Sequence, residues 1–146
     1  MNWTTFTNES YHIDYLDSWQ IIESPDLLFY AKTSDSPETF FTVIKQREFS
    51  GDESLNTFVE MAQEVMLSDT LEIYTGYNIN EVVFDSERKV YSGEYFTTKK
   101  EQNYVIFFLY TLSQDNFVID VSFKTKSENL KFKKSIFNDA VYNIME

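Results

Sequence analysis

The sequence contains no cysteine, one histidine, three glycines and two prolines among its 146 residues. Without cysteine the chain has no disulfide, no thiolate zinc or iron–sulfur site and no cysteine nucleophile. Three scattered glycines do not form a phosphate-binding loop, a dinucleotide fingerprint or a Gly-x-Ser-x-Gly nucleophile elbow. We therefore expect a protein that is not an enzyme and that binds neither a cofactor nor a metal.

Positive charge is also scarce, because 12 Lys and Arg stand against 24 Asp and Glu, a net charge of −12. The excess is uneven: residues 1–98 carry 18 acids and 5 bases, whereas residues 99–146 carry 6 acids and 7 bases. Such a chain offers no basic surface for nucleic acid or for an anionic membrane. The acidic part serves either solubility alone or the attraction of a basic protein partner.

Long hydrophobic runs are missing too. The longest, YVIFFLY at 104–110, is far too short to span a bilayer. The first ten residues, MNWTTFTNES, lack the basic and then apolar pattern of a signal peptide. We expect a cytoplasmic protein; a periplasmic or lipid-anchored protein that has lost its signal segment is the alternative. The length fits a single domain over 1–146.

Aromatic residues are abundant, with 14 Phe and 10 Tyr, and they favour β-strands. Strand-like segments lie between short turn signals. They cover residues 11–15, 19–22, 27–33, 39–49, 70–77, 79–85, 88–98, 104–112 and 117–125. The last two are predicted to form a hairpin across SQDN at 113–116.

Two segments have helical periodicity. The first is predicted over about 52–67, where SGDE offers a capping box with Ser50 as the N-cap and Glu53 at the third helical position. The second is predicted over about 128–145, with Ser127 as the N-cap and Glu128 in the first turn. Its apolar positions lie on one side, and its lysines are expected on a solvated face. The apolar positions are Leu130, Ile136, Phe137, Ala140, Val141 and Ile144, and the lysines are Lys131, Lys133 and Lys134.

Neither face of the strand at 104–110 is polar, so both of its faces must be covered. Two helices and mostly short connections then predict an α+β fold. The expected architecture is an α/β/α sandwich with a largely antiparallel sheet of about six to eight strands. Alternatively both helices share one face, and the other face meets a partner or a second copy of the chain. Monomer and homodimer both remain open.

The stretch YHIDYLDSW at 11–19 holds the only histidine, two residues before an acid. His12 and Asp14 project from one side of a strand, but two ligands do not make a zinc site. Tyr11, Ile13 and Tyr15 alternate with them, and Trp19 follows as a large apolar anchor. We expect the inner face to build the core and His12 to do no chemistry.

A second aromatic pattern lies later in the chain, where Tyr91, Gly93 and Tyr95 share one strand face. Such a face either lines a pocket for a ring or an acyl chain, or packs rings over the glycine within a sheet. The second interpretation is the commoner one.

The order hairpins, helix, strands, helix, with YHIDYLDSW near the start, resembles the PsbP-like family. That fold is shared by an extrinsic photosystem II protein, a Ran-binding import factor and small bacterial proteins. Members begin with an aromatic-x-apolar-x-Tyr-Pro strand and a Trp shortly after it. Tyr11, Ile13, Tyr15 and Trp19 occupy those places, and Leu16 stands where Pro is usual. GDESLNTF at 51–58 resembles the start of the mid-chain helix of the family.

The resemblance implies a non-enzymatic protein-binding domain. Members of the PsbP-like family serve in different assemblies, so the fold alone does not name the partner. The acidic excess favours an immunity protein that neutralises a basic toxin, with Glu48, Asp52 and Glu53 as candidate partner contacts. The alternative is a chaperone or carrier for an apolar effector segment or a lipid-like ligand, as in the type VI effector chaperones of this family.

Overall fold

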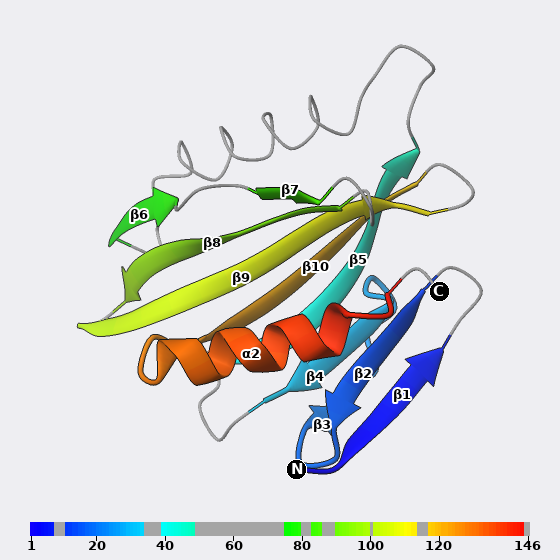
Figure 1. Ribbon diagram of the computed structural model, residues 1–146, viewed down its shortest axis with the longest axis horizontal. Coiled ribbons are helices and arrows are strands. Elements are labelled where there is room, and N and C mark those ends of the chain that lie inside the picture. The colour runs from blue at the N-terminus through cyan, green and yellow to red at the C-terminus, as the bar shows by residue number, and fades with distance from the viewer. Residues whose placement is uncertain are drawn as a thin grey trace.

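The computed structural model describes residues 1–7, 11–33, 39–48, 75–79, 83–85, 90–99, 101–113 and 117–144. Within them lie ten strands and one helix (Figure 1). The elements are β1 (Trp3–Thr7), β2 (His12–Leu16), β3 (Gln20–Ile21), β4 (Phe29–Lys32), β5 (Phe40–Glu48), β6 (Thr75–Ile79), β7 (Val83–Asp85), β8 (Val90–Lys99), β9 (Gln102–Leu112), β10 (Phe117–Lys126) and α2 (Leu130–Val141).

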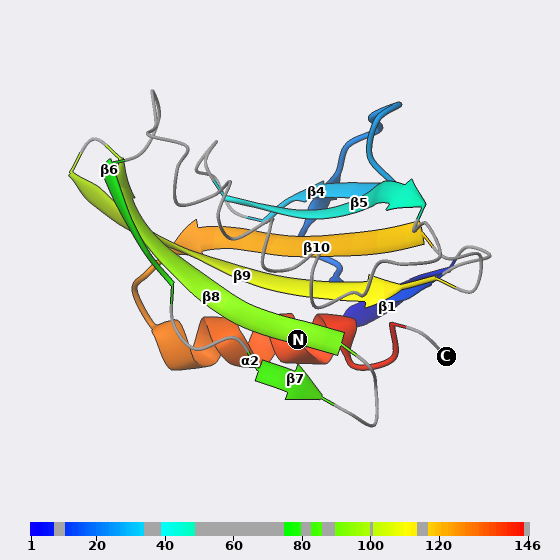
Figure 2. The same cartoon turned by 90° about the horizontal axis from the view of Figure 1, so that it is seen from above.

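Eight of these strands form one antiparallel sheet in the order β3-β4-β5-β10-β9-β8-β6, with β7 also pairing with β8. The α+β class and the antiparallel sheet are therefore as predicted. The hairpin between β9 and β10 is confirmed, since Leu112 pairs with Val118 across residues 113–116. The hairpin between β8 and β9 is tighter, because Lys99 pairs with Gln102. The long central strands curve strongly, as Figure 2 shows.

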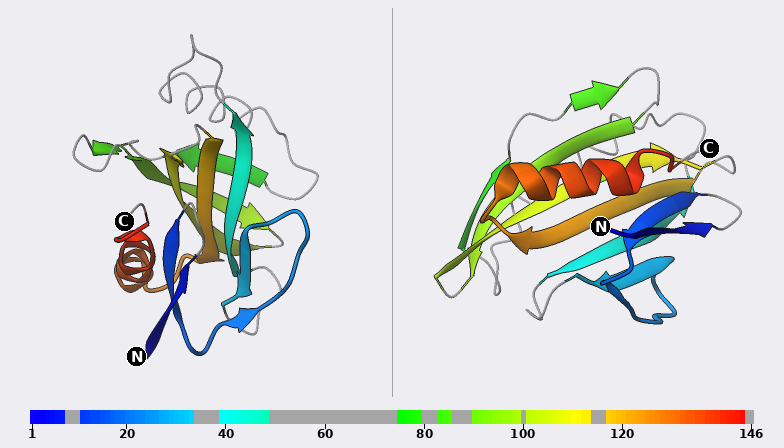
Figure 3. Two further views of the ribbon diagram at one scale, coloured as in Figure 1. Left: turned by 90° about the vertical axis from the view of Figure 1, so that its right-hand side faces the viewer. Right: turned by 60° about the horizontal axis from the view of Figure 1, so that its bottom comes forward.

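One face of the sheet is covered by α2 and by the two-stranded sheet of β1 and β2 (Figure 3). Alternate residues of β4, β5, β9 and β10 point into this core. The most completely buried of them are Ala31, Phe41, Val43, Val105, Phe107, Leu109, Ile119 and Val121. The amide of His12 donates to the carbonyl of Ile144, which joins β2 to the end of the chain (2.9 Å).

The second face of β9 is buried as well. Tyr104, Phe108 and Tyr110 lie on that face, and each is at most 6% exposed. On β10, Val118 and Lys124 are also buried. The prediction that this central strand is covered on both sides is confirmed. The helix predicted over 52–67 lies outside the described residues.

The C-terminal helix begins and ends inside its predicted bounds of 128–145. Strand β10 continues to Lys126, and the amide of Ser127 donates to the carbonyl of Asn103, so Ser127 extends the sheet instead of capping the helix. The residue before the helix is Asn129, in the left-handed conformation with φ 52°, and its side chain makes no capping bond. Glu128 thus precedes the helix and is not in its first turn.

Strand β1 was not predicted. It pairs with β2 over its whole length, from Trp3 opposite Leu16 to Thr7 opposite His12. The segment WTTFT contains only aromatic and β-branched residues, which is a strand signal. The missed strand matters because it supplies Phe6, which forms one wall of the groove described below.

Candidate functional site

The polar side chains of β2 pair with threonines of β1. The hydroxyl of Thr5 donates to the carboxylate of Asp14 (2.6 Å), and Nδ1 of His12 lies 3.1 Å from the hydroxyl of Thr7. Within the part of the chain that the structure describes, no three His, Asp or Glu residues group as metal ligands would. His12 and Asp14 therefore form part of a cross-strand polar row with the threonines of β1.

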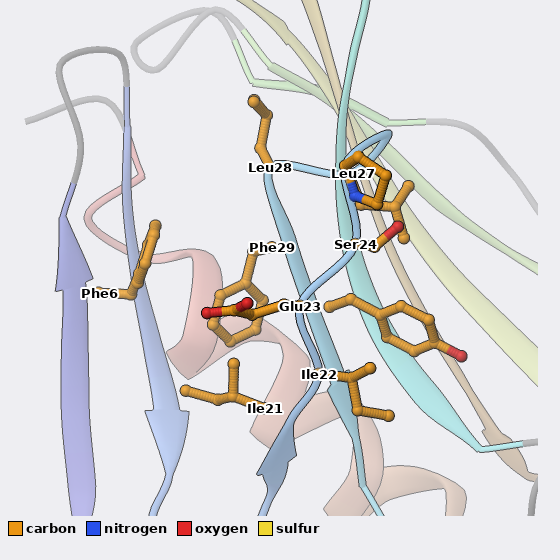
Figure 4. Close-up of a pocket in the computed structure, with 10 residues that line it drawn as sticks. Phe6, Ile21, Ile22, Glu23, Ser24, Leu27, Leu28 and Phe29 are labelled. Atoms are coloured by element: carbon orange, nitrogen blue, oxygen red, sulfur yellow. The ribbon is translucent and has the colours of Figure 1, made fainter.

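A concave feature lies between β1 and the segment that joins β3 to β4 (Figure 4). We call it the edge groove. Its volume is about 640 Å³, within the range of ligand-binding sites. Among the described residues its lining consists of Phe6, Ile21, Ile22, Glu23, Ser24, Pro25, Leu27, Leu28, Phe29 and Tyr30. Ile21 projects toward Phe6 in Figure 4.

Backbone hydrogen bonds tie both ends of the segment that lines the groove. The amide of Ile22 donates to the carbonyl of Tyr30 (2.9 Å), and the amide of Leu28 donates to the carbonyl of Val43 (2.8 Å). The buried hydroxyl of Tyr11 also donates to the carbonyl of Leu28 (2.9 Å). Burial raises the pKa of Tyr11, so the hydroxyl keeps its proton and remains a donor. These bonds anchor both ends of the segment that lines the groove.

Two adjacent isoleucines of the groove are open to solvent. Ile21 is 46% exposed and Ile22 is 36% exposed. Leaving this much apolar surface in water costs free energy that a bound partner would recover. Ile21 ends β3, the edge strand of the large sheet, and β3 is only two residues long. A short edge strand offers few free backbone groups for pairing with another strand.

The described lining of the groove contains one acid, Glu23, and no base. Residues 1–31 contain five acids and no Lys or Arg, and every described lining residue comes from this segment. Glu23 is itself part of the wall, and Asp26 lies in the same connection. An apolar floor with carboxylates at the border fits an apolar segment with cationic neighbours and disfavours an anionic head group.

The predicted partner contacts are not part of this groove as far as the structure describes them. Glu48 is the last residue of β5 and pairs with Phe117 of β10, and Asp52 and Glu53 lie outside the described residues. Sequence reasoning missed the groove, although two signals were present. The pairs Ile21–Ile22 and Leu27–Leu28 flank the turn ESPD, and basic residues are absent up to Lys32.

The aromatic face of β8 is explained by packing. Gly93 lies directly opposite Phe108 in the register of β8 and β9, and Tyr91 lies opposite Tyr110. The rings of Phe108 and Tyr110 lie 5.5 Å apart, and both side chains are buried. The glycine leaves room for the neighbouring ring, which supports ring packing over a glycine at this position.

Comparison with solved structures identifies the architecture. The chain superposes on the cyanobacterial PsbP protein, CyanoP, of Synechocystis sp. PCC 6803 with a TM-score of 0.71 at 16% identity, over 97% of this chain and 91% of that one. The fold is PsbP-like. This confirms the resemblance that YHIDYLDSW and the order of elements indicated.

Two further structures share the fold. LpqN of Mycobacterium tuberculosis, involved in cell envelope biogenesis, gives a TM-score of 0.60 at 11% identity, over 99% of this chain and 91% of that one. PA94 of Pseudomonas aeruginosa, a protein of unknown function, gives 0.57 at 12% identity, over 96% and 94%. No family model and no curated protein matches the sequence. At these identities the PsbP-like likeness describes the fold and leaves function to the residues of this chain.

Proposed function

We propose that this PsbP-like chain is a non-catalytic binding domain that holds an apolar, positively charged segment of a protein partner in the edge groove. The observation that carries the proposal is the exposed pair Ile21 and Ile22 in a groove built from a segment without Lys or Arg. Apolar contact would supply affinity, and the acids would steer and orient the partner.

Within this class, the groove favours a chaperone or carrier over an immunity protein that acts through charge alone. A purely electrostatic contact does not require exposed isoleucines, whereas a carrier of an apolar segment does. Glu48, Asp52 and Glu53 remain predicted contacts for an immunity function. Among the described residues no helix has the length and apolar character needed to cross a membrane.

The test uses two labelled synthetic peptides and fluorescence anisotropy. In one peptide leucine alternates with lysine, and in the other glutamate replaces each lysine. The lysine peptide is expected to bind, with affinity that falls as salt rises, and the glutamate peptide is expected to bind far more weakly. Equal binding of both peptides would contradict the role of the acids.

Variants locate the binding surface. The double change Ile21→Ser and Ile22→Ser removes exposed apolar surface and should weaken the lysine peptide roughly tenfold or more. The control is Tyr142→Ser, an exposed aromatic residue that follows α2 and is distant in sequence from the groove. For a partner captured from the source cell, loss of binding with E48Q/D52N/E53Q but not with I21S/I22S would favour the immunity function instead.

A further inference from the structure

A second cavity, of about 340 Å³, lies at the start of α2 and differs in character from the edge groove. We call it the lysine pocket. Its described walls combine apolar side chains, hydroxyls and two lysines. They are Leu16, Ser18, Trp19, Thr33, Thr39, Phe123, Thr125, Lys126, Phe132, Lys133 and Ile136.

The lysine pocket carries charge opposite to that of the chain as a whole. Among the described lining residues the charged side chains are Lys126 and Lys133, in a protein with a net charge of −12. Both lysines come from the part beyond residue 98, in which bases slightly outnumber acids. Glu128, which precedes α2, is the described acid that acts on Lys133. Two lysines at one cavity would favour an anionic ligand over a cationic one.

Lys133 departs from the solvated position predicted for it. Its neighbours Lys131 and Lys134 are exposed, but Lys133 is half-buried and donates to the carbonyl of Lys126 (2.7 Å). Desolvation lowers the pKa of Lys133, Glu128 opposes this shift and Lys126 adds to it. An anion placed between the two lysines would relieve their mutual repulsion.

The other lining residues of the lysine pocket are apolar or carry hydroxyl groups. Trp19 and Phe132 provide aromatic surface, and Phe132 is 52% exposed although it is a large apolar side chain. The buried hydroxyl of Thr33 has no hydrogen-bond partner within the described part of the chain, so hydrogen-bonding capacity is left over in this wall. The first-turn amides of α2, which no side chain caps, add partial positive charge near Phe132 and Lys133.

We propose that the lysine pocket binds a small organic anion, a carboxylate on an apolar body. Lys126 and Lys133 would hold the carboxylate, and Trp19 and Phe132 would cover the apolar body. This site is separate from the edge groove, whose described lining residues are entirely different and include an acid but no lysine. The proposal does not depend on the proposed partner binding.

The test compares three probes of equal chain length: octanoate, octanol and octylammonium. Titrations followed by ¹H–¹⁵N NMR should show octanoate shifting the amides of Ser18, Thr33, Thr125 and Phe132. Octanol should bind about tenfold more weakly, because it lacks the charge-assisted bonds, and octylammonium should not bind. Equal binding of octanol and octanoate, or shifts centred on Ile21 and Leu28, would overturn the assignment.

Matched variants complete the experiment. K126Q/K133Q should weaken octanoate about tenfold, and K131Q/K134Q, which removes the same charge from the exposed side of α2, should leave it nearly unchanged. Equal losses in the two double variants would contradict a specific site. I21S/I22S should keep its affinity for octanoate, because Ile21 and Ile22 line the edge groove and not the lysine pocket. The proposal for the edge groove and the proposal for the lysine pocket can therefore fail independently of each other. The probe comparison on the unaltered chain decides the question even if K126Q/K133Q fails to fold.

Discussion

The hydroxyl of Tyr11 donates a 2.9 Å hydrogen bond to the carbonyl oxygen of Leu28. Tyr11 is the first residue of the stretch that carries the PsbP-like pattern, and Leu28 lies in the wall of the edge groove. This hydrogen bond thus joins the core strand that the sequence pattern predicted to the edge groove, which it did not predict. Phe6 continues the connection, because its ring stacks on Tyr11 at 6.0 Å.

Tyr11→Phe is expected to lower the free energy of unfolding by about 1–2 kcal/mol at neutral pH, since it leaves the carbonyl of Leu28 without this donor. Burial raises the pKa of Tyr11 above its ordinary value of 10.0, so the folded state disfavours the phenolate. The stabilisation is therefore complete below pH 10 and is lost as pH rises above it, at about 1.4 kcal/mol per pH unit. Chemical denaturation of both proteins from pH 7 to 11 should show their difference shrinking above pH 10. A constant difference would contradict this account.

Glu101→Gly is expected to stabilise the protein. Glu101 lies in the tight connection between β8 and β9 with φ 66°, a left-handed conformation that costs a residue with a Cβ about 1–2 kcal/mol. Glycine removes that cost but loses more entropy on folding, so a net gain of about 0.5–1 kcal/mol is expected in denaturant melts. Glu101→Gln keeps the strained geometry and should give no such gain, which separates the backbone effect from the charge.

Phe137→Ala should destabilise the protein by about 3–5 kcal/mol, because it opens a cavity between α2 and the sheet. The ring of Phe137 lies 5.7 Å from that of Phe107 and 6.1 Å from that of Phe41. Phe132→Ala on the same helix should cost less than about 1 kcal/mol, since its ring is half in solvent. Thermal melts of both variants check the contrast, and similar losses would place α2 differently on the sheet.

His12→Gln should change the free energy of unfolding by less than about 0.5 kcal/mol, because its contact with Thr7 is exposed. It should also leave the affinity for the lysine peptide unchanged. Ile13→Ala on the same strand removes a fully buried side chain and should cost about 2–5 kcal/mol. If His12→Gln kept normal stability but bound the lysine peptide much more weakly, His12 would have a direct role in binding.

Much of the fold follows from local pattern. The aromatic and β-branched runs placed β2, β4, β5, β8, β9 and β10, since alternation along a strand decides which side chains meet the core. Tyr11, Ile13 and Trp19 are core residues for the same reason. Strand β1 was not predicted because WTTFT is only five residues long, although its composition is that of a strand.

The sequence by itself determined the order of strands and helix along the chain, the burial of both faces of β9 and the uneven charge. Only the tertiary structure decided where the edge groove and the lysine pocket form. Phe6 and Ile21 are far apart in sequence and share a groove only because the β1–β2 hairpin packs beside β4. Lys133 is half-buried because Ser127 pairs with Asn103 and delays the start of α2, which brings Lys133 to the carbonyl of Lys126. Local periodicity is a property of neighbouring residues, whereas both cavities arise from segments that only packing brings together.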